Sequence, residues 1–274
     1  VGSAVYGVAV VALMMGFSQL PALGGAWLIL AGVVAGGAFL WHERRTASPV
    51  LDLRLFRGNR VFTLSSLAAL TNYAATASIA FLLSLYLQYI KALSPREAGV
   101  MLVAQPLVQA VFSPLAGRLS DRIETRVVAS VGMAFTVVGL VMLTFLGFDT
   151  SLIYVVASLV ILGFGFALFS SPNTNAIMGS VPSRYYWAAS GAVGTMRVLG
   201  QMTSMAVITI VFAALLGDGQ ITRERYDSFI SAARICFSIS SLLCFTGVFF
   251  SWFRGSLHTL KNETVSGKGE ADEQ

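Results

Sequence analysis

The most constraining feature of the sequence is its opening stretch, residues 1–41, which contains no charged side chain. As one helix this stretch would be about 60 Å long, twice the roughly 30 Å thickness of the hydrocarbon core of a bilayer. Pro21 and Gly24 interrupt it, and such residues mark turns. The stretch therefore predicts two membrane-spanning helices, over 1–19 and 24–41.

Six further apolar runs follow, each long enough to cross a bilayer. Of the 274 residues, 56% are hydrophobic and 11% charged, whereas a soluble domain carries roughly 25% charged residues. This deficit excludes an ordinary soluble enzyme, and the fold class that we expect is an all-α polytopic membrane protein with eight transmembrane helices. The six runs are 61–90, 98–116, 127–147, 151–171, 190–216 and 235–253.

The distribution of Lys and Arg predicts the orientation in the membrane. Of the 18 basic residues, 12 lie in the segments on one side of the expected spans and 4 on the other, while Arg197 and Arg234 lie inside or at the edge of spans. Because basic residues are enriched in cytoplasmic loops, we expect a multi-pass protein of the plasma membrane with both ends of the chain in the cytoplasm. The basic segments are 42–60, 117–126, 172–189 and the polar tail 254–274, which we expect to be disordered.

Residues suited to catalysis are missing from the expected spans. All 13 acidic residues lie outside the apolar runs, His42 and His258 lie in polar segments, and Cys236 and Cys244 form no metal-binding spacing. We therefore expect no enzyme, no catalytic residue, no metal site and no cofactor. The basic residues sit in short connections rather than in a stripe, so the expected surroundings are the lipid bilayer and no nucleic acid.

Polar side chains inside the spans are the main candidates for a function, because they are costly in lipid. Gln105, Gln109 and Ser113 recur every four residues and so share one helix face. Two interpretations are open: a hydrated substrate path, or hydrogen bonds between helices, worth about 0.6 kcal/mol per pair. For Arg197 the second interpretation is a side chain that reaches to the membrane surface. The remaining candidates are Asn72, Tyr73, Asn173, Asn175 and Arg197.

The segment Gly117–Arg126 packs three arginines and two acids into ten residues between two apolar runs. Charge alone makes it a positive-inside anchor, but the order Gly-x-Leu-Ser-Asp-Arg resembles the cytoplasmic loop motif of the major facilitator superfamily. The sequence departs from that motif at Ile123 and Glu124, where the family favours glycine and basic residues. The resemblance implies a conformational gate formed by Gly117, Arg118, Asp121, Arg122 and Arg126.

Two other segments are similar to the fourteen-helix drug:proton antiporters of that superfamily. Pro49–Phe56 reads Pro-Val-Leu-Asp-Leu-Arg-Leu-Phe, and Pro172–Met178 together with Thr195-x-Arg197-x-x-Gly200 resembles their late-helix signature. The resemblance implies that 1–41 forms two linker transmembrane helices, 42–60 a cytoplasmic loop, and 61–253 the six-helix C-terminal half of a transporter. Because the sequence begins with Val1 inside an apolar run, we interpret it as part of a longer protein.

The function implied by this resemblance is secondary active transport, namely proton-coupled export of drugs or of amphipathic or cationic small molecules by alternating access. The implied partners are the missing N-terminal half, a small-molecule substrate and protons. The alternatives are a transporter of one specific metabolite and a non-transporting receptor or sensor on the same scaffold.

Overall fold

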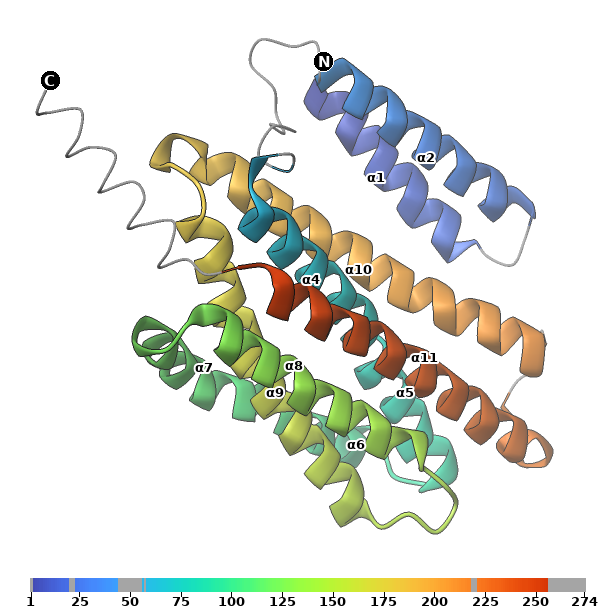
Figure 1. The fold of residues 1–274 in the computed structure, drawn as a ribbon. Coiled ribbons are helices and arrows are strands. Elements are labelled where there is room, and N and C mark those ends of the chain that lie inside the picture. The colour runs from blue at the N-terminus through green and yellow to red at the C-terminus, as the bar shows by residue number, and fades with distance from the viewer. Residues whose placement is uncertain (1, 20–22, 44–55, 57, 218–220, 256–274) are drawn as a thin grey trace, which may run out of the picture.

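The computed structural model describes residues 2–19, 23–43, 56, 58–217 and 221–255, and every regular element within them is helical. Figure 1 shows long helices that run side by side. The elements are α1 (Gly2–Ser18), α2 (Leu23–Glu43), α4 (Arg60–Thr76), α5 (Ile79–Leu85), the π-helical turn η1 (Tyr86–Ile90), α6 (Pro95–Leu102), α7 (Ala104–Arg122), α8 (Thr125–Thr144), α9 (Leu152–Gly179), the 3₁₀ turn η2 (Ser183–Tyr185), α10 (Tyr186–Leu215), the 3₁₀ turn η3 (Arg223–Arg225) and α11 (Tyr226–Phe253).

Six helical stretches in the described part of the chain are long and apolar enough to cross a membrane, in agreement with an all-α membrane fold. The expected count of eight is not confirmed. Helix α1 has 17 residues, which corresponds to about 26 Å, and the apolar part of α2 covers 24–39. The six stretches are 60–90, 95–122, 125–144, 152–179, 183–215 and 223–253.

Close helix contacts hold the bundle together. Helix α4 packs between α10 and α11, and α8 packs against both α9 and α11 (Figure 1). Where α8 crosses α9, a Cβ atom added to Gly132 would lie 2.6 Å from the backbone nitrogen of Phe169, and one added to Gly165 would lie 2.7 Å from the Gly132 carbonyl oxygen. Small residues of this kind let membrane helices approach closely.

The helices α1 and α2 form a hairpin that lies beyond α10, away from the rest of the bundle (Figure 1). The hydroxyl of Tyr6 in α1 lies 2.6 Å from the Thr195 hydroxyl in α10. This hydrogen bond ties the hairpin to α10 two residues before Arg197.

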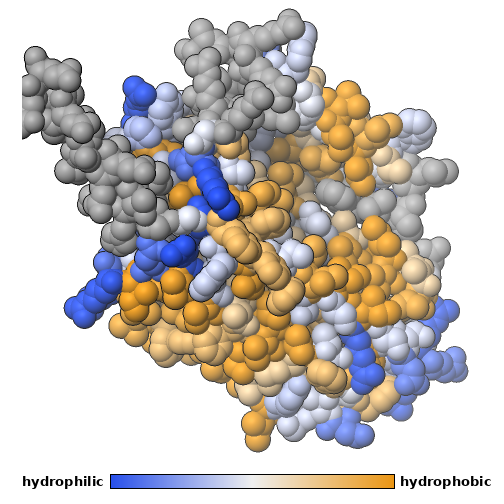
Figure 2. All heavy atoms as spheres, viewed as in Figure 1, coloured by the Kyte–Doolittle hydropathy of each residue, from blue (hydrophilic) through white to orange (hydrophobic). Residues whose placement is uncertain are grey.

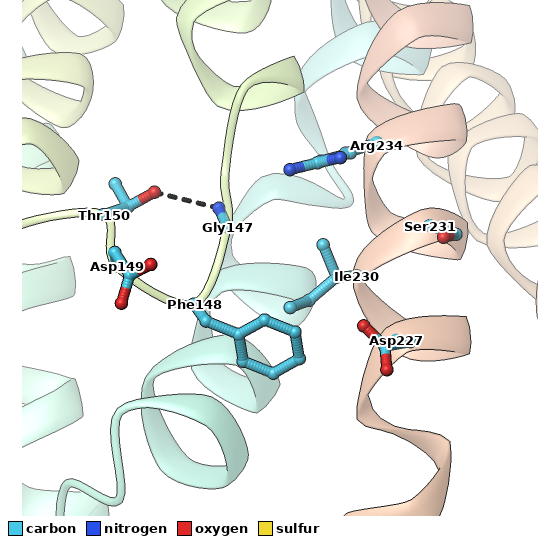
Figure 3. A pocket seen from close by; sticks show the side chains of 8 residues that line it. All are labelled: Gly147, Phe148, Asp149, Thr150, Asp227, Ile230, Ser231 and Arg234. Carbon is cyan, nitrogen blue, oxygen red and sulfur yellow. Dashed lines mark hydrogen bonds between the residues drawn. The ribbon is translucent and has the colours of Figure 1, made fainter.

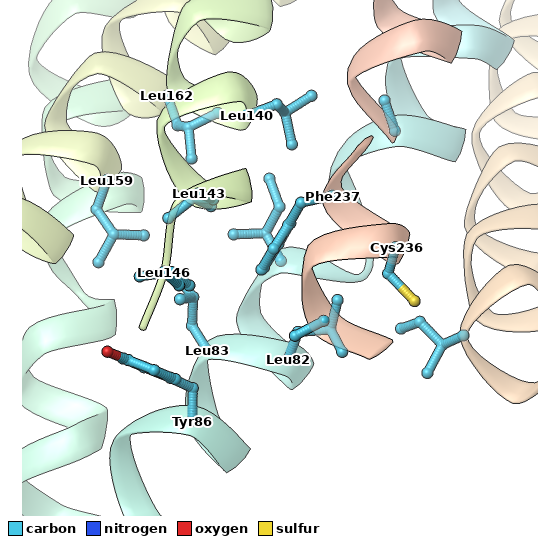
Figure 4. Packing of buried hydrophobic residues seen from close by; sticks show 14 of the residues in the cluster. Leu82, Leu83, Tyr86, Leu140, Leu143, Leu146, Leu159, Leu162, Cys236 and Phe237 are labelled. Atoms are coloured by element: carbon cyan, nitrogen blue, oxygen red, sulfur yellow. The ribbon is translucent and has the colours of Figure 1, made fainter. Parts of the chain in front are cut away.

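The apolar core lies between α5, α8, α9 and α11 (Figure 4). Leu82 and Leu83 come from α5, Leu140 from α8, Leu162 from α9 and Phe237 from α11, and all five are 0% exposed. Burial of such side chains removes apolar area from contact with solvent.

The outside of the bundle is also apolar. Helix α7 and the residue before it expose an apolar stripe at every fourth residue: Val103, Leu107, Val111, Leu115 and Leu119. On the face drawn in Figure 2, hydrophobic side chains cover the middle and hydrophilic ones gather toward the two ends. Apolar patches of this extent do not occur on soluble monomers, so lipid is the surrounding that this surface fits.

Three boundaries differ from those expected from the sequence. The motif segment 117–126 is not a loop for most of its length, because α7 continues to Arg122 and α8 begins at Thr125. Helix α9 continues through Pro172 to Gly179, so the polar residues after the proline are helical. The bundle also includes Arg254, which is 1% exposed, although the sequence assigned it to the tail; the expectations for 44–55 and 256–274 lie outside the described residues.

Candidate functional site

A cationic and aromatic cluster lies at mid-height of the spans 60–90, 152–179 and 183–215. The guanidinium carbon of Arg197 lies 5.1 Å from the centre of the Tyr73 ring, and that ring meets the Phe166 ring edge to face at 5.7 Å. Arg197 lies 11 residues inside α10, about 16 Å from its start. This depth argues against a side chain that reaches the membrane surface. A cation over an aromatic face gains about 0.5–2 kcal/mol.

The exposed side chain of Arg197 retains hydrogen-bonding capacity. A guanidinium carries five N–H donors, and within the described residues its contact is the Tyr73 ring, which accepts no conventional hydrogen bond. Because an arginine at mid-membrane costs about 2.5–3.5 kcal/mol on insertion scales, its remaining donors require water, a ligand or a polar group of another segment. The cluster therefore fits a hydrated surface better than a lipid-facing one.

The three residues of the α7 stripe, Gln105, Gln109 and Ser113, are half-buried. Each lies two residues after a member of the exposed apolar stripe, and two residues rotate a helix by about 200°, so the two stripes lie on opposite faces. Helix α7 approaches α9 closely at the first of these residues, because a Cβ added to Gly163 of α9 would contact the backbone carbonyl oxygen of Gln105. Within the described residues the side-chain amides of Gln105 and Gln109 make no hydrogen bond. Both side-chain amides are therefore available to a ligand or to water.

The asparagines that the sequence singled out have different environments. Asn72 is 0% exposed in α4, and neither its side-chain oxygen nor its nitrogen has a hydrogen-bond partner among the described residues. Asn175 is exposed on α9. Asn173 is buried and donates to the Ser65 carbonyl oxygen at 3.0 Å. The structure therefore places Asn173 in a helix contact rather than beside Tyr73 and Arg197.

Asn173 also belongs to a buried network that sequence reasoning missed. Nη1 of Arg254 donates to Oδ1 of Asn173 at 2.7 Å and to the Ser65 hydroxyl at 3.3 Å. Burial lowers the pKa of Arg254 to about 10, an effect that nearby Glu124 opposes, so the guanidinium stays charged at neutral pH. An arginine directly after an apolar run is typical of a surface anchor. The sequence signal for a buried partner of Arg254 was limited to the polar residues Ser65 and Asn173 within the helices.

The motif segment Gly117–Arg126 joins α7 to α8. A Cβ added to Gly117 would lie 3.4 Å from the Ser171 hydroxyl, so this glycine sits at a close contact between α7 and α9. Arg118, Asp121 and Arg122 are exposed. The ion pair of this segment runs instead between Arg126 Nε and Glu124 Oε2, at 2.7 Å.

A cavity of about 550 Å³ opens at the other end of the bundle, between α11 and the connection from α8 to α9 (Figure 3). Nε of Arg234 donates to the Leu146 carbonyl oxygen at 2.7 Å, and the Tyr86 hydroxyl donates to the Gly147 carbonyl oxygen at 2.7 Å. Lys91 donates to the next carbonyl, that of Phe148. Three donors thus fix three consecutive carbonyls, which gives this connection a structural role. Within the described residues no group of His, Cys, Asp and Glu side chains could hold a metal ion.

Together these features define a polytopic helical membrane protein with a polar cluster at mid-height of its bundle. A profile of the Major Facilitator Superfamily matches residues 65–272, and the chain belongs to this superfamily. Its members are transporters rather than enzymes.

The relatives are transporters and drug-resistance proteins. The chain is 30% identical to the riboflavin transporter RibZ of Clostridioides difficile over 77% of its own length. It is 31% identical to the multidrug resistance protein Stp of Mycobacterium tuberculosis over 78%, and 29% identical to the methyl viologen resistance protein SmvA of Salmonella typhimurium over 84%. The matches cover 46%, 41% and 47% of these proteins, so the chain spans about half the length of the relatives. The expected resemblance to drug-efflux members of the superfamily is confirmed.

Proposed function

We propose that the chain forms part of a secondary transporter that exports amphipathic or cationic small molecules, coupled to proton entry, by alternating access. The observation that carries this proposal is the exposed guanidinium of Arg197, which is held on Tyr73 at mid-height of the bundle. Substrate sites of secondary transporters lie near the bilayer midplane. The likeness to drug-resistance proteins supports export as the direction.

In this proposal 61–253 is the C-terminal half-bundle and 1–41 supplies two linker helices. The protein lies in the plasma membrane. The loop 42–60 and the tail after α11 lie on its cytoplasmic side. The N-terminal half completes the central cavity and supplies the proton-carrying carboxylates, since the acidic residues of this chain lie outside its expected spans. The bilayer, the N-terminal half, protons and the substrate are the partners.

We assign the cavity surface to Tyr73, Arg197, Gln105, Gln109 and Ser113. An aromatic ring and unpaired amides can bind planar amphipathic molecules by stacking and hydrogen bonds. Asn72 and Asn175 remain candidates on the same path. The gate is assigned to Gly117, Arg118, Asp121, Arg122 and Arg126, at the end of the bundle where α7 joins α8.

The test measures efflux of a fluorescent amphipathic dye from energised cells that express the complete protein. With a neutral or anionic dye, Arg197→Ala is expected to lower efflux at least tenfold at equal expression, because the guanidinium that donates hydrogen bonds to the dye is lost. Arg223→Ala removes an exposed arginine from η3 at the end of the bundle and serves as the matched control. Wild-type efflux in Arg197→Ala would refute the assignment of Arg197 to the substrate path.

A second candidate function is transport of one specific metabolite, which the likeness to a protein named riboflavin transporter favours. Arg197 can donate to carbonyl or carboxylate oxygens, which neutral and anionic metabolites carry and a methyl viologen dication lacks. Competition separates the two functions. Inhibition of dye efflux by many unrelated cations supports drug export, whereas inhibition by riboflavin alone supports the metabolite transporter.

A further inference from the structure

Arg254 is a buried cation with unused hydrogen-bonding capacity. Its side chain lies where the start of α4, the end of α9 and the end of α11 meet, and Nη1 is bound by Asn173 and Ser65. Nη2 is shielded from solvent and has no hydrogen-bond partner among the described residues. A buried donor without an acceptor is destabilising, and more so when it is charged. The site therefore requires an acceptor within reach.

Glu124 is the complementary group on the neighbouring helix. It precedes the first residue of α8 and forms an ion pair with Arg126 at 2.7 Å. The same oxygen, Oε2, is shielded from solvent and receives no hydrogen bond of acceptable geometry from the described residues. A carboxylate accepts several hydrogen bonds when it is ionised, so Glu124 has capacity for a second cation.

Helix register brings these two groups together. The Ser130 hydroxyl of α8 donates to the Ser251 hydroxyl of α11 at 2.9 Å, and the two helices run in opposite directions. Three residues before Ser130 in α8 is Val127, and three residues after Ser251 is Arg254, so Val127 and Arg254 lie at about the same height. The negative charge of Glu124 raises the pKa of Arg254, and the positive charge of Arg126 lowers it. Glu124 thus lies near two arginines: it is in contact with Arg126, and its charge acts on Arg254.

We propose that Glu124 is a switch carboxylate that exchanges between Arg126 and Arg254 and thereby controls how firmly the end of α9 is held against α4. Glu124 occupies the position at which the sequence departs from the superfamily motif. The departure places an acid next to a buried arginine, and Arg254 acts as a positioning residue through Asn173 rather than by contact with substrate.

The movable element is the last part of α9. Pro172 cannot donate a backbone hydrogen bond, which weakens the helix just before Asn173. Beyond it, α9 is tied to α4 by Asn173, which donates to the Ser65 carbonyl oxygen, and by Asn59, which donates to the Ser180 carbonyl oxygen at 2.5 Å. When Glu124 binds Arg254, the guanidinium is fixed on both sides and Asn173 is held. When Glu124 binds Arg126 instead, the proline hinge is freer to open.

The experiment uses Ile177→Cys as a reporter near the end of α9, in the complete protein in membrane vesicles. Ile177 is 0% exposed and packs in one cluster with Phe62 of α4, so a cysteine there is shielded until the end of α9 moves away from α4. The native Cys236 and Cys244 are buried. The measured quantity is the rate at which a water-soluble maleimide labels the reporter. Labelling reports the position of α9 whether or not substrate moves, so this inference and the proposed export can fail independently.

Glu124→Gln is expected to raise the labelling rate about fivefold, because Arg254 loses its carboxylate. Arg126→Gln is expected to lower the rate about threefold, because Glu124 is then free for Arg254. In an Arg254→Gln background, Glu124→Gln is expected to change the rate less than twofold. Glu124→Asp, which keeps the charge, restores the wild-type rate, and Glu224→Gln in η3 at the other end is the matched control.

Two outcomes overturn the proposal. One is a change of the same sign in Glu124→Gln and Arg126→Gln, which would show that loss of either charge simply loosens the bundle. The other is an undiminished effect of Glu124→Gln in the Arg254→Gln background. If Arg254→Gln does not fold, the opposite signs of the first two variants still decide the question, since both variants keep Arg254, Asn173 and Ser65 in place.

Discussion

The crossing of α8 and α9 provides the sharpest test of the fold, through Gly165→Ala. The new Cβ would lie 2.7 Å from the Gly132 carbonyl oxygen and 2.7 Å from the backbone nitrogen of Thr136. Both neighbours are backbone atoms of α8, so the helices themselves must separate. Overpacking of this kind costs typically about 1–3 kcal/mol, and the better helix propensity of alanine returns at most about 1 kcal/mol. We expect a net loss of about 1–2 kcal/mol in the free energy of unfolding.

The two buried cysteines supply the assay. Cys236 is 1% exposed and Cys244 0%, so a thiol-reactive dye reports the temperature at which the purified protein unfolds in detergent. A loss of 1 kcal/mol corresponds to about 2–4 °C for a chain of this size. The matched control is Gly194→Ala in α10, where a Cβ meets nothing within 4 Å, and we expect an unchanged or higher midpoint. A midpoint in Gly165→Ala at or above that of the wild type would refute the close crossing of α8 and α9.

Three further predictions concern topology, the gate and the buried amide. A cysteine introduced at Thr150 is expected to react with an impermeant reagent outside intact cells, and one at Ser48 only after lysis; the reverse would overturn the orientation inferred from the basic residues. Asp121→Asn is expected to slow transport several-fold with KM nearly unchanged, because a gate alters the conformational equilibrium; wild-type turnover would contradict the gate. Asn72→Leu is expected to raise the unfolding midpoint, because it removes an unpartnered buried amide, and also to reduce efflux; a lowered midpoint would mean that Asn72 has a partner in the native protein.

The sequence predicted the helical membrane fold well because each apolar run must satisfy its own backbone inside lipid. It predicted the helix ends poorly. Pro172 suggested the end of a helix, yet α9 continues to Gly179. Neighbouring helices can stabilise a helix beyond a proline, and the contacts of Asn173 with Ser65 and Arg254 lie at that point. Contacts of this kind join residues far apart in the sequence, and no local pattern reports them.

The candidate site was predicted in part. The contact of Tyr73 with Arg197 joins two candidates from helices far apart in the sequence, and Phe166 completes the cluster. Phe166 was not predicted because one phenylalanine in an apolar run carries no distinguishing signal. Arg254 was not predicted because its burial depends on where α11 ends relative to α4 and α9.

The chemistry of each polar group explains which intramembrane residues carry information. Hydroxyls bond to the preceding turn of their own helix: Thr76 donates to the Asn72 carbonyl oxygen, Thr136 to that of Gly132 and Ser158 to that of Tyr154. Such a hydroxyl is satisfied locally and says nothing about its surroundings. The amide of Asn173 and the guanidinium of Arg254 extend further and find partners on other helices. In this bundle, amides and guanidinium groups therefore mark helix junctions, whereas a serine or threonine does so only where its hydroxyl bonds across helices, as Ser130 does with Ser251.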